Sequence, residues 1–173
     1  MAHPLDFFKY CPHCGSSRWS IHNFKSKQCE DCGFIFYSNP SAANVAVIIN
    51  EKNELLAVRR KNEPAKGTLD LPGGFTDMEE TGEQGVIREV KEETGLDVER
   101  CEYLFSIPNL YHYSGMDIHT LDMFFRCHVK NTQDICAMDD AEEVLWIPLR
   151  DVNAADFGLQ SIQKGVRLLL KNL

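Results

Sequence analysis

The chain has 173 residues, a length that suits one domain or one domain with a small appendage. Hydrophobic residues make up 43% of the sequence and aromatic residues 10%, so the chain can build a core and global disorder is not expected. The net charge of −8 argues against a nucleic-acid backbone as the main partner, because phosphate binding needs clustered cations. No apolar run approaches the roughly 20 residues of a membrane helix, and no secretory signal is visible. We therefore expect a cytoplasmic protein without a membrane or nucleic-acid partner.

Two Cys-x-x-Cys pairs lie near the start, with 14 residues between them: Cys11 and Cys14, then Cys29 and Cys32. In a chain without a visible export signal, such a duplication predicts a tetrahedral zinc site of four thiolates rather than disulfides. A redox Cys-x-x-Cys is the alternative, and the duplication disfavours it. Four protein ligands leave no position for water or substrate, so the zinc is expected to be structural.

The segments around these cysteines predict a small zinc ribbon. Residues 18–28 alternate like a hairpin strand, and residues 33–40 supply another short strand. Asn39-Pro40 marks a boundary. We therefore predict a zinc ribbon over residues 1–40 and a second domain over residues 41–173.

The second domain shows strands on both sides of a helix. Residues 44–50 predict a buried strand, and residues 53–61 predict its partner across a turn. Three further strands are predicted at 101–107, 121–129 and 142–149. Residues 158–173 place apolar side chains at helical spacing and predict a closing amphipathic helix. Strands with two helices predict an α/β layered domain.

The first helix of this domain is defined by its caps. Thr81 and Gln84 form a capping box, and Gly95 suits a left-handed C-terminal cap, so the helix is expected over residues 82–94. Its apolar residues share one face, which we expect to pack on the sheet: Val86, Ile87 and Val90.

Glu89, Glu92 and Glu93 fall on an adjacent face of this helix. Like charges three and four residues apart repel each other, and the helix dipole disfavours negative charge near the C-terminus, so a compensating cation is expected. Three convergent carboxylates suit Mg²⁺ or Mn²⁺. A solvated acidic stripe is the alternative. The glycines of the preceding loop, residues 71–75, bring backbone close to the helix and favour the metal site.

The loop and the helix together resemble the Nudix box, G-x5-E-x7-R-E-U-x-E-E-x-G-U, in which U is aliphatic. Every fixed position matches over 23 residues: Gly74, Glu80, Arg88, Glu89, Val90, Glu92, Glu93, Gly95 and Leu96. Chance agreement over so many positions is negligible, and residues 41–173 are identified as a member of the Nudix hydrolase family. The resemblance implies an α/β/α sandwich around a mixed sheet. It also implies metal-dependent hydrolysis of a nucleoside diphosphate linked to another moiety.

The same resemblance implies roles for the matched residues. The expected Mg²⁺ or Mn²⁺ ligands are three carboxylates and one backbone carbonyl: Glu89, Glu92, Glu93 and Gly74. Glu80 and Arg88 are expected to form an ion pair that shapes the turn between loop and helix. A plain surface pair between Arg88 and Glu92 is the alternative, and such pairs contribute little.

Nudix proteins often take a base or a fourth metal ligand from a downstream loop. The acidic candidates there are Asp139, Asp140, Glu142 and Glu143. We favour Glu143, and next to it Glu142, because both precede a predicted strand. A solvated loop is the alternative.

A zinc ribbon before a Nudix domain resembles the NADH pyrophosphatases, which carry the motif S-Q-P-W-P-F-P-x-S after the box. Residues 106–114 read S-I-P-N-L-Y-H-Y-S and keep both serines, the first proline and an aromatic at the sixth position. We therefore expect a small nucleotide substrate that resembles NADH or ADP-ribose. Hydrolysis of modified nucleoside triphosphates, or nucleotide binding without catalysis, are the alternatives.

Three residues are assigned to substrate contacts. Tyr111 and Tyr113 would face the same side of an extended strand and stack on a base. Half-buried strand tyrosines are the alternative. Arg59 is assigned to substrate binding with them. A homodimer is implied by the resemblance to the NADH pyrophosphatases.

Overall fold

The computed structural model describes residues 3–133, 135–138 and 141–172. The chain divides into two compact units. One unit holds Met1–Pro40 and Leu110–His119, and the other holds Ser41–Asn109 and Thr120–Leu173. Within the described part of the chain, no helix is long and apolar enough to cross a membrane.

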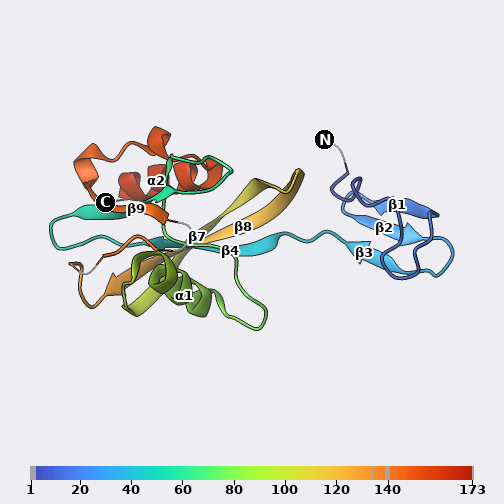
Figure 1. The fold of residues 1–173 in the computed structure, drawn as a ribbon, viewed down its shortest axis with the longest axis horizontal. Helices are drawn as coiled ribbons and strands as arrows, with labels where there is room; N and C mark the ends of the chain where they lie inside the picture. Colours follow the sequence, from blue (N-terminus) through green and yellow to red (C-terminus); the bar gives the residue numbers. More distant parts are fainter. Residues whose placement is uncertain (1–2, 134, 139–140, 173) are drawn as a thin grey trace. The chain divides into compact units, whose positions relative to one another are not determined.

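The N-terminal segment folds as a three-stranded antiparallel sheet (Figure 1). Its strands are β1 (Trp19–Asn23), β2 (Ser26–Cys29) and β3 (Ile35–Tyr37), with β2 in the middle. The apolar core of this sheet is small: Cys11, Trp19 and Cys29 are buried, and Phe34 packs against them. Because so few apolar side chains are buried, a core of this size needs a metal or a cross-link for stability.

Six longer or more deeply buried strands form two further three-stranded sheets. One sheet has the order β4 (Ser41–Val47), β8 (Met116–Val129), β7 (Val98–Tyr113). The other has the order β6 (Leu69–Asp70), β5 (Glu54–Arg60), β9 (Ala141–Pro148). β4 runs parallel to β8, whereas β5 is antiparallel to both of its neighbours. The strand arrangement is therefore mixed, as predicted.

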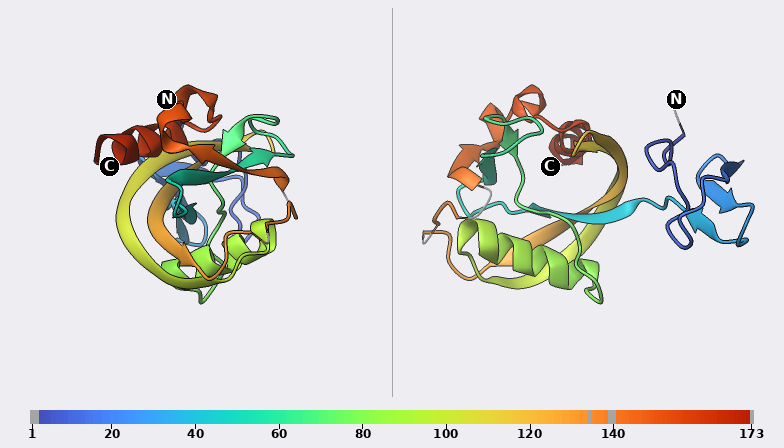
Figure 2. Two further views of the ribbon diagram at one scale, coloured as in Figure 1. Left: turned by 90° about the vertical axis from the view of Figure 1, so that its left-hand side faces the viewer. Right: turned by 45° about the vertical axis from the view of Figure 1, so that its right-hand side comes forward.

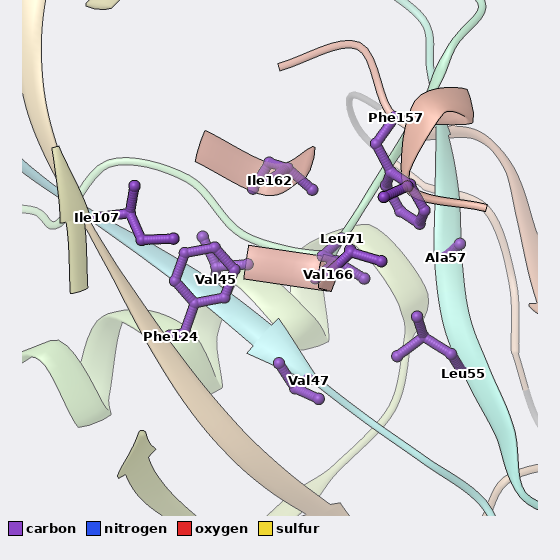
Figure 3. Close-up of a cluster of buried hydrophobic side chains, with 11 residues drawn as sticks. Val45, Val47, Leu55, Ala57, Leu71, Ile107, Phe124, Phe157, Ile162 and Val166 are labelled. Carbon is purple, nitrogen blue, oxygen red and sulfur yellow. The ribbon is translucent and has the colours of Figure 1, made fainter. Parts of the chain in front are cut away.

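Two helices cover opposite faces of these sheets (Figure 2). The helical segments are α1 (Gly82–Thr94), α2 (Gln160–Asn172) and the short 3₁₀ turns η1 (Leu149–Asp151) and η2 (Ala154–Asp156). Val86 and Val90 of α1 pack with residues of both sheets in one apolar cluster. Ile162 and Val166 of α2 pack with the other faces of the same strands in a second cluster, drawn in Figure 3. Helix, sheet and helix thus form three layers, which confirms the predicted α/β/α sandwich.

Two local expectations were incomplete. The strand predicted at 101–107 extends to Tyr113, so most of the stretch that resembles the specificity motif is strand. β7 lies at the edge of its sheet, where Pro108 removes no essential hydrogen bond. The turn to β8 has positive φ at Ser114 (51°) and Gly115 (75°), as a tight hairpin requires. Ile87, expected to face the sheet, is 38% exposed, since it lies one residue away from the buried stripe of α1.

Candidate active site

Helix α1 begins and ends at defined caps. The N–H of Gln84 donates to Thr81 Oγ1 at 3.2 Å, and the N–H of Thr81 donates to Gln84 Oε1 at 2.8 Å, which completes the capping box. Gly95 closes the helix with φ of 75°, and its N–H donates to the carbonyl of Lys91 at 3.0 Å. These caps fix the bounds of the helix on which the three glutamates lie.

Glu93 is the most buried of the three glutamates, at 8% exposure. It accepts a hydrogen bond from the N–H of Gly73 at 3.0 Å, so its carboxylate is turned towards the loop before α1. Gly73 has φ of 153°, and a Cβ there would lie 2.0 Å from the carbonyl oxygen of Asn44. Only glycine fits this position, and the loop therefore lies close enough to the helix to hold Glu93.

Gly74 lies directly against the second carboxylate. A Cβ on Gly74 would be 2.6 Å from Glu89 Oε1, which shows how closely the loop backbone approaches this side chain. The carbonyl of Gly74 accepts a hydrogen bond from the N–H of Asn44 at 2.7 Å. A carbonyl oxygen has two lone pairs, so this bond leaves one for a cation. Ligation by Gly74 remains a prediction.

Arg88 joins the loop to the acidic face of the helix. Its guanidinium donates two hydrogen bonds to Glu80, at 2.8 and 3.0 Å. It also donates to Glu89 at 2.8 Å and to Glu92 at 2.9 Å. A further bond reaches the carbonyl of Phe75 at 3.0 Å. The surface pair with Glu92 is thus only one of several interactions of Arg88, and the bidentate pair with Glu80 is the one that spans loop and helix.

These contacts change the acidity of both partners. Hydrogen bonds from Arg88, and then from the N–H of Asp77, hold the pKa of Glu80 below its ordinary value. The hydrogen bond to Glu80 in turn raises the pKa of Arg88, and the bonds to Glu89 and Glu92 add to this. Arg88 and Glu80 therefore both stay charged at neutral pH, and the guanidinium of Arg88 places a positive charge beside Glu89 and Glu92.

The glutamates offer a donor set of the right chemistry for Mg²⁺ or Mn²⁺. All the donors are oxygens, and they come from one turn of helix and the adjoining loop. The carboxylates point to different partners, Glu93 to the loop and Glu89 and Glu92 to Arg88. Among the residues that the structure describes, the only group of three or more His, Cys, Asp or Glu side chains placed to hold a metal ion is the four ribbon cysteines, whose sulfurs lie within 4.8 Å of one another. The three glutamates are not brought together as such a group.

The four ribbon cysteines fit a zinc ion by distance as well as by chemistry. The Sγ atoms of Cys11 and Cys32 are 3.8 Å apart. Those of Cys14 and Cys29 are 3.6 Å apart. A tetrahedron with Zn–S bonds of about 2.3 Å has sulfur–sulfur edges of about 3.8 Å. Two edges of the cluster therefore have the length expected for a tetrahedral zinc site of four thiolates, and all four sulfurs lie within 4.8 Å of one another.

The favoured downstream residue, Glu143, lies opposite Arg59 across β5 and β9. Arg59 Nε donates to Glu143 Oε2 at 3.0 Å, and a second nitrogen of the same guanidinium donates to the carbonyl of Gly67 at 3.0 Å. Two residues that the sequence assigned to separate roles are thus an ion pair. The side chain of Glu143 is 54% exposed and remains open to a ligand.

Glu142 lies at an open cavity that Lys61, Lys66 and Ala141 also line. The segment before β9 is tied to the end of α1, since the N–H of Met138 donates to the carbonyl of Glu93 at 3.0 Å. The start of β9 at Ala141 therefore lies near the last turn of α1, which contains Glu92 and Glu93. The other two candidates, Asp139 and Asp140, lie outside the described residues.

Tyr111 and Tyr113 stack on each other, with ring centroids 6.3 Å apart and planes inclined by 23°. They lie on the same side of β7, and Tyr113 is 54% exposed, so it is not a core residue. Both belong to the compact unit that contains residues 1–40, whereas α1 belongs to the other unit. A role in substrate binding remains a prediction.

Two residues at this site were not singled out from the sequence. Asn44 of β4 contacts both the loop and α1, and Gly85 gives it room within the helix. Each left a signal. Asn44 is a polar residue within the apolar run of residues 42–49. Gly85 is a glycine inside a helix, where glycine is unfavourable unless another group packs closely against it.

Comparison with known proteins agrees with this geometry. A family model described as the NUDIX domain matches residues 39–167. The chain is 36% identical over 132 residues to an ADP-ribose pyrophosphatase of Methanocaldococcus jannaschii, which covers 74% of this chain and 73% of that protein. It is 35% identical over 114 residues to the NAD-capped RNA hydrolase NudC of Vibrio atlanticus. That match covers 66% of this chain but only 42% of the relative.

A solved structure has the same fold over nearly the whole chain. A NUDIX hydrolase from Nitrosomonas europaea superimposes with a TM-score of 0.74 at 24% identity. The match covers 95% of this chain and 91% of that structure. At this identity the likeness concerns the fold.

Proposed function

The chain belongs to the NUDIX family and is a Nudix hydrolase, and from this premise we propose that it cleaves the pyrophosphate bond of a nucleoside diphosphate linked to another moiety. The observation that carries the proposal is the contact between loop and helix. Gly73 binds Glu93 and Gly74 lies against Glu89, so the glycine loop and the carboxylates form one surface.

We propose that Glu89, Glu92 and Glu93 hold Mg²⁺ or Mn²⁺, with the carbonyl of Gly74 as a further ligand. When bound, the cation neutralises the anionic bridge and lowers the pKa of a water molecule. Arg88, paired with Glu80, keeps the loop against the helix.

Glu143 is the proposed base or fourth ligand. In the structure, Arg59 Nε donates a hydrogen bond to the carboxylate of Glu143 at 3.0 Å. The guanidinium would also offer donors to the phosphates of a substrate, since arginine matches phosphate oxygens in geometry. We therefore propose that Arg59 binds the phosphates of the substrate and also orients the carboxylate of Glu143.

The proposed substrates are ADP-ribose and NADH-like dinucleotides. The relative from Methanocaldococcus jannaschii is named an ADP-ribose pyrophosphatase, and the relative from Vibrio atlanticus is named an NAD-capped RNA hydrolase. Tyr111 and Tyr113 are proposed to stack on the base. Hydrolysis of modified nucleoside triphosphates is the second candidate, and nucleotide binding without catalysis is the third.

The remaining proposals concern organisation. Residues 1–40 form a domain around a structural zinc ion bound by Cys11, Cys14, Cys29 and Cys32, and residues 41–173 form the hydrolase domain. The protein acts in the cytoplasm as a homodimer. The sulfur–sulfur distances support the zinc site.

A substrate panel with Mg²⁺ tests the function. ADP-ribose, NADH, a diadenosine polyphosphate and an oxidised nucleoside triphosphate are incubated with the zinc-loaded protein, and the products are separated by chromatography. We expect AMP from ADP-ribose or NADH, and on the order of 100-fold less product from the Glu92→Gln variant. Pyrophosphate released from the triphosphate alone would favour the second candidate. Binding without any product would favour the third.

A further inference from the structure

The loop between β6 and α1 is bonded along the free edge of β4. Three backbone hydrogen bonds join them: Ala46 N to Pro72 O at 2.7 Å, Asn44 N to Gly74 O at 2.7 Å, and Thr76 N to Ala42 O at 3.1 Å. The loop therefore follows β4 like an extra edge strand. Asn44 lies at the middle of this pairing and binds the residue that lies against Glu89.

The side chain of Asn44 adds a fourth connection. Its Nδ2 donates to Thr76 Oγ1 at 3.0 Å, and Asn44 is only 2% exposed. Asn44 thus holds the loop at two points, Gly74 through the main chain and Thr76 through the amide. Between these points lies Phe75, whose carbonyl accepts from Arg88.

Asn44 also determines how close α1 can come. A Cβ on Gly85 would lie 2.2 Å from Asn44 Nδ2, so the helix can pack here only because residue 85 is glycine. Glycine inside a helix is less stable than alanine by about 1 kcal/mol. The close contact is therefore present although glycine lowers the stability of the helix. The amide of Asn44 contacts the loop at Thr76 and the helix at Gly85.

One feature of Asn44 is unfavourable for stability. Its Oδ1 is buried and has no hydrogen-bond partner among the described residues. A buried unpaired acceptor costs about 1–3 kcal/mol. Because the unpaired acceptor lowers the stability of the fold, the amide of Asn44 is better explained by its bond to the loop than by a gain in stability.

We propose that Asn44 is a positioning residue for the carboxylates of α1 and acts through the glycine loop. Asn44 fixes the segment that contains Gly73 and Gly74. Gly73 binds Glu93 at 3.0 Å, and Gly74 lies against Glu89. The proposal rests on the proposed function, because it assumes that these carboxylates bind the catalytic cation. The side chain of Asn44 is buried and bonded to the loop, so the role proposed for it is positioning and not direct contact with a ligand.

The expected effect falls on the metal and on turnover. A displacement of about 1 Å at a reacting centre can lower the rate on the order of 100-fold. The loss of a group that only orients metal ligands typically weakens metal affinity by about 10–100-fold. Because the buried side chain of Asn44 is proposed to act on the metal ligands and not on the nucleotide, KM should stay within about twofold of the wild-type value.

The experiment compares Asn44→Ala with a matched pair at the acceptor. Thr76→Val keeps the shape of the side chain and removes the oxygen, whereas Thr76→Ser keeps the oxygen. Mn²⁺ binding is measured by electron paramagnetic resonance on the zinc-loaded protein, together with kcat, KM and melting temperature. We expect Asn44→Ala and Thr76→Val to weaken Mn²⁺ binding about tenfold or more and to lower kcat at unchanged KM. Thr76→Ser should restore both quantities.

A control and two outcomes decide the proposal. Asn50→Ala, in the turn after β4, removes the bond that Asn50 Nδ2 donates to Glu54 at 2.7 Å and the two that Asn50 Oδ1 accepts from the N–H groups of Lys52 and Glu54. It should leave Mn²⁺ binding and kcat unchanged. Mn²⁺ affinity and kcat within twofold of wild type in Thr76→Val would overturn the proposal, even if Asn44→Ala does not fold. A third result separates the two proposals. If Asn44→Ala weakens Mn²⁺ binding but the wild-type protein hydrolyses no pyrophosphate, the positioning role is supported and the proposed function is refuted.

Discussion

The ribbon and the α1 site both present candidate metal ligands, but they support them differently. In the ribbon, each cysteine pair is followed by a glycine at positive φ, Gly15 at 76° and Gly33 at 74°. The N–H of each glycine donates to the carbonyl of the first cysteine of its pair at 2.9 Å. The two knuckles are therefore copies of one local geometry, and two sulfur–sulfur distances between them, 3.8 and 3.6 Å, match the edge of a tetrahedral zinc site.

In the α1 site the ligands share a helix, yet different partners set their directions. Glu93 is held by Gly73, and Glu89 and Glu92 are held by Arg88. The loop that contains Gly73 is held in turn by β4. The difference teaches that short-range spacing is enough for a closed structural site, whereas an open site for a reacting ligand depends on distant parts of the chain.

Replacing a ribbon cysteine should have the largest effect. Cys11→Ser is expected to abolish stoichiometric zinc binding and the folded ribbon, because zinc contributes about 10–16 kcal/mol to comparable sites. Elemental analysis and hydrogen exchange over residues 3–40 would measure this. Cys101→Ser, outside the ribbon, should keep one zinc per chain. Wild-type protein without zinc, or with a disulfide between two of the four ribbon cysteines, would contradict the predicted zinc site.

The next largest effect is expected from the exposed carboxylate of α1. Glu92→Gln should lower turnover on the order of 100-fold or more, the range that positioned charged groups usually supply. The fold should persist, since an exposed pair with Arg88 adds at most about 1 kcal/mol. Melting temperature without divalent metal should therefore change by at most about 4 °C. Near-wild-type turnover in Mg²⁺ would remove Glu92 from the site.

A smaller effect is expected at the tip of the β7–β8 hairpin, which belongs to the same compact unit as residues 1–40. Tyr111→Ala should raise KM for ADP-ribose about fivefold or more, because a stacked base is worth about 1–3 kcal/mol. Mn²⁺ binding should be unchanged. A lower melting temperature with unchanged KM would instead make Tyr111 a structural residue.

The smallest effect concerns acid stability. Arg88 lowers the pKa of Glu80 from its ordinary value of 4.5, so Glu80 stabilises the fold above that pH and loses this contribution as the pH falls through the lowered pKa. Wild-type protein should therefore lose more melting temperature between pH 6 and pH 3 than the Glu80→Gln variant does. Parallel curves for the two proteins would show that the pair with Arg88 does not contribute to stability.

Local rules predicted most of α1 and the ribbon. The caps at Thr81 and Gly95 follow from a few neighbouring residues, and so does the spacing of the cysteines. The length of β7 did not follow, because Pro108 reads as a strand breaker until the strand is known to lie at a sheet edge.

The long-range pairs of the site were also hidden from the sequence. Arg59 and Glu143 were both named as candidates, but their contact depends on the register of β5 against β9, 84 positions apart in the chain. Asn44 was overlooked for the same reason, since its partners lie on a loop and a helix that follow much later. Sequence patterns predict such residues only after the pairing of the strands is known.

The most direct test combines zinc content and turnover in one sample of the Glu93→Gln variant. Glu93 is the buried carboxylate that joins α1 to the glycine loop. Purified variant and wild-type protein are analysed for zinc by mass spectrometry and assayed with ADP-ribose and Mg²⁺. We predict one zinc per chain in both proteins and a loss of turnover on the order of 100-fold or more in the variant. A variant that retains zinc and hydrolyses ADP-ribose at the wild-type rate would contradict this prediction.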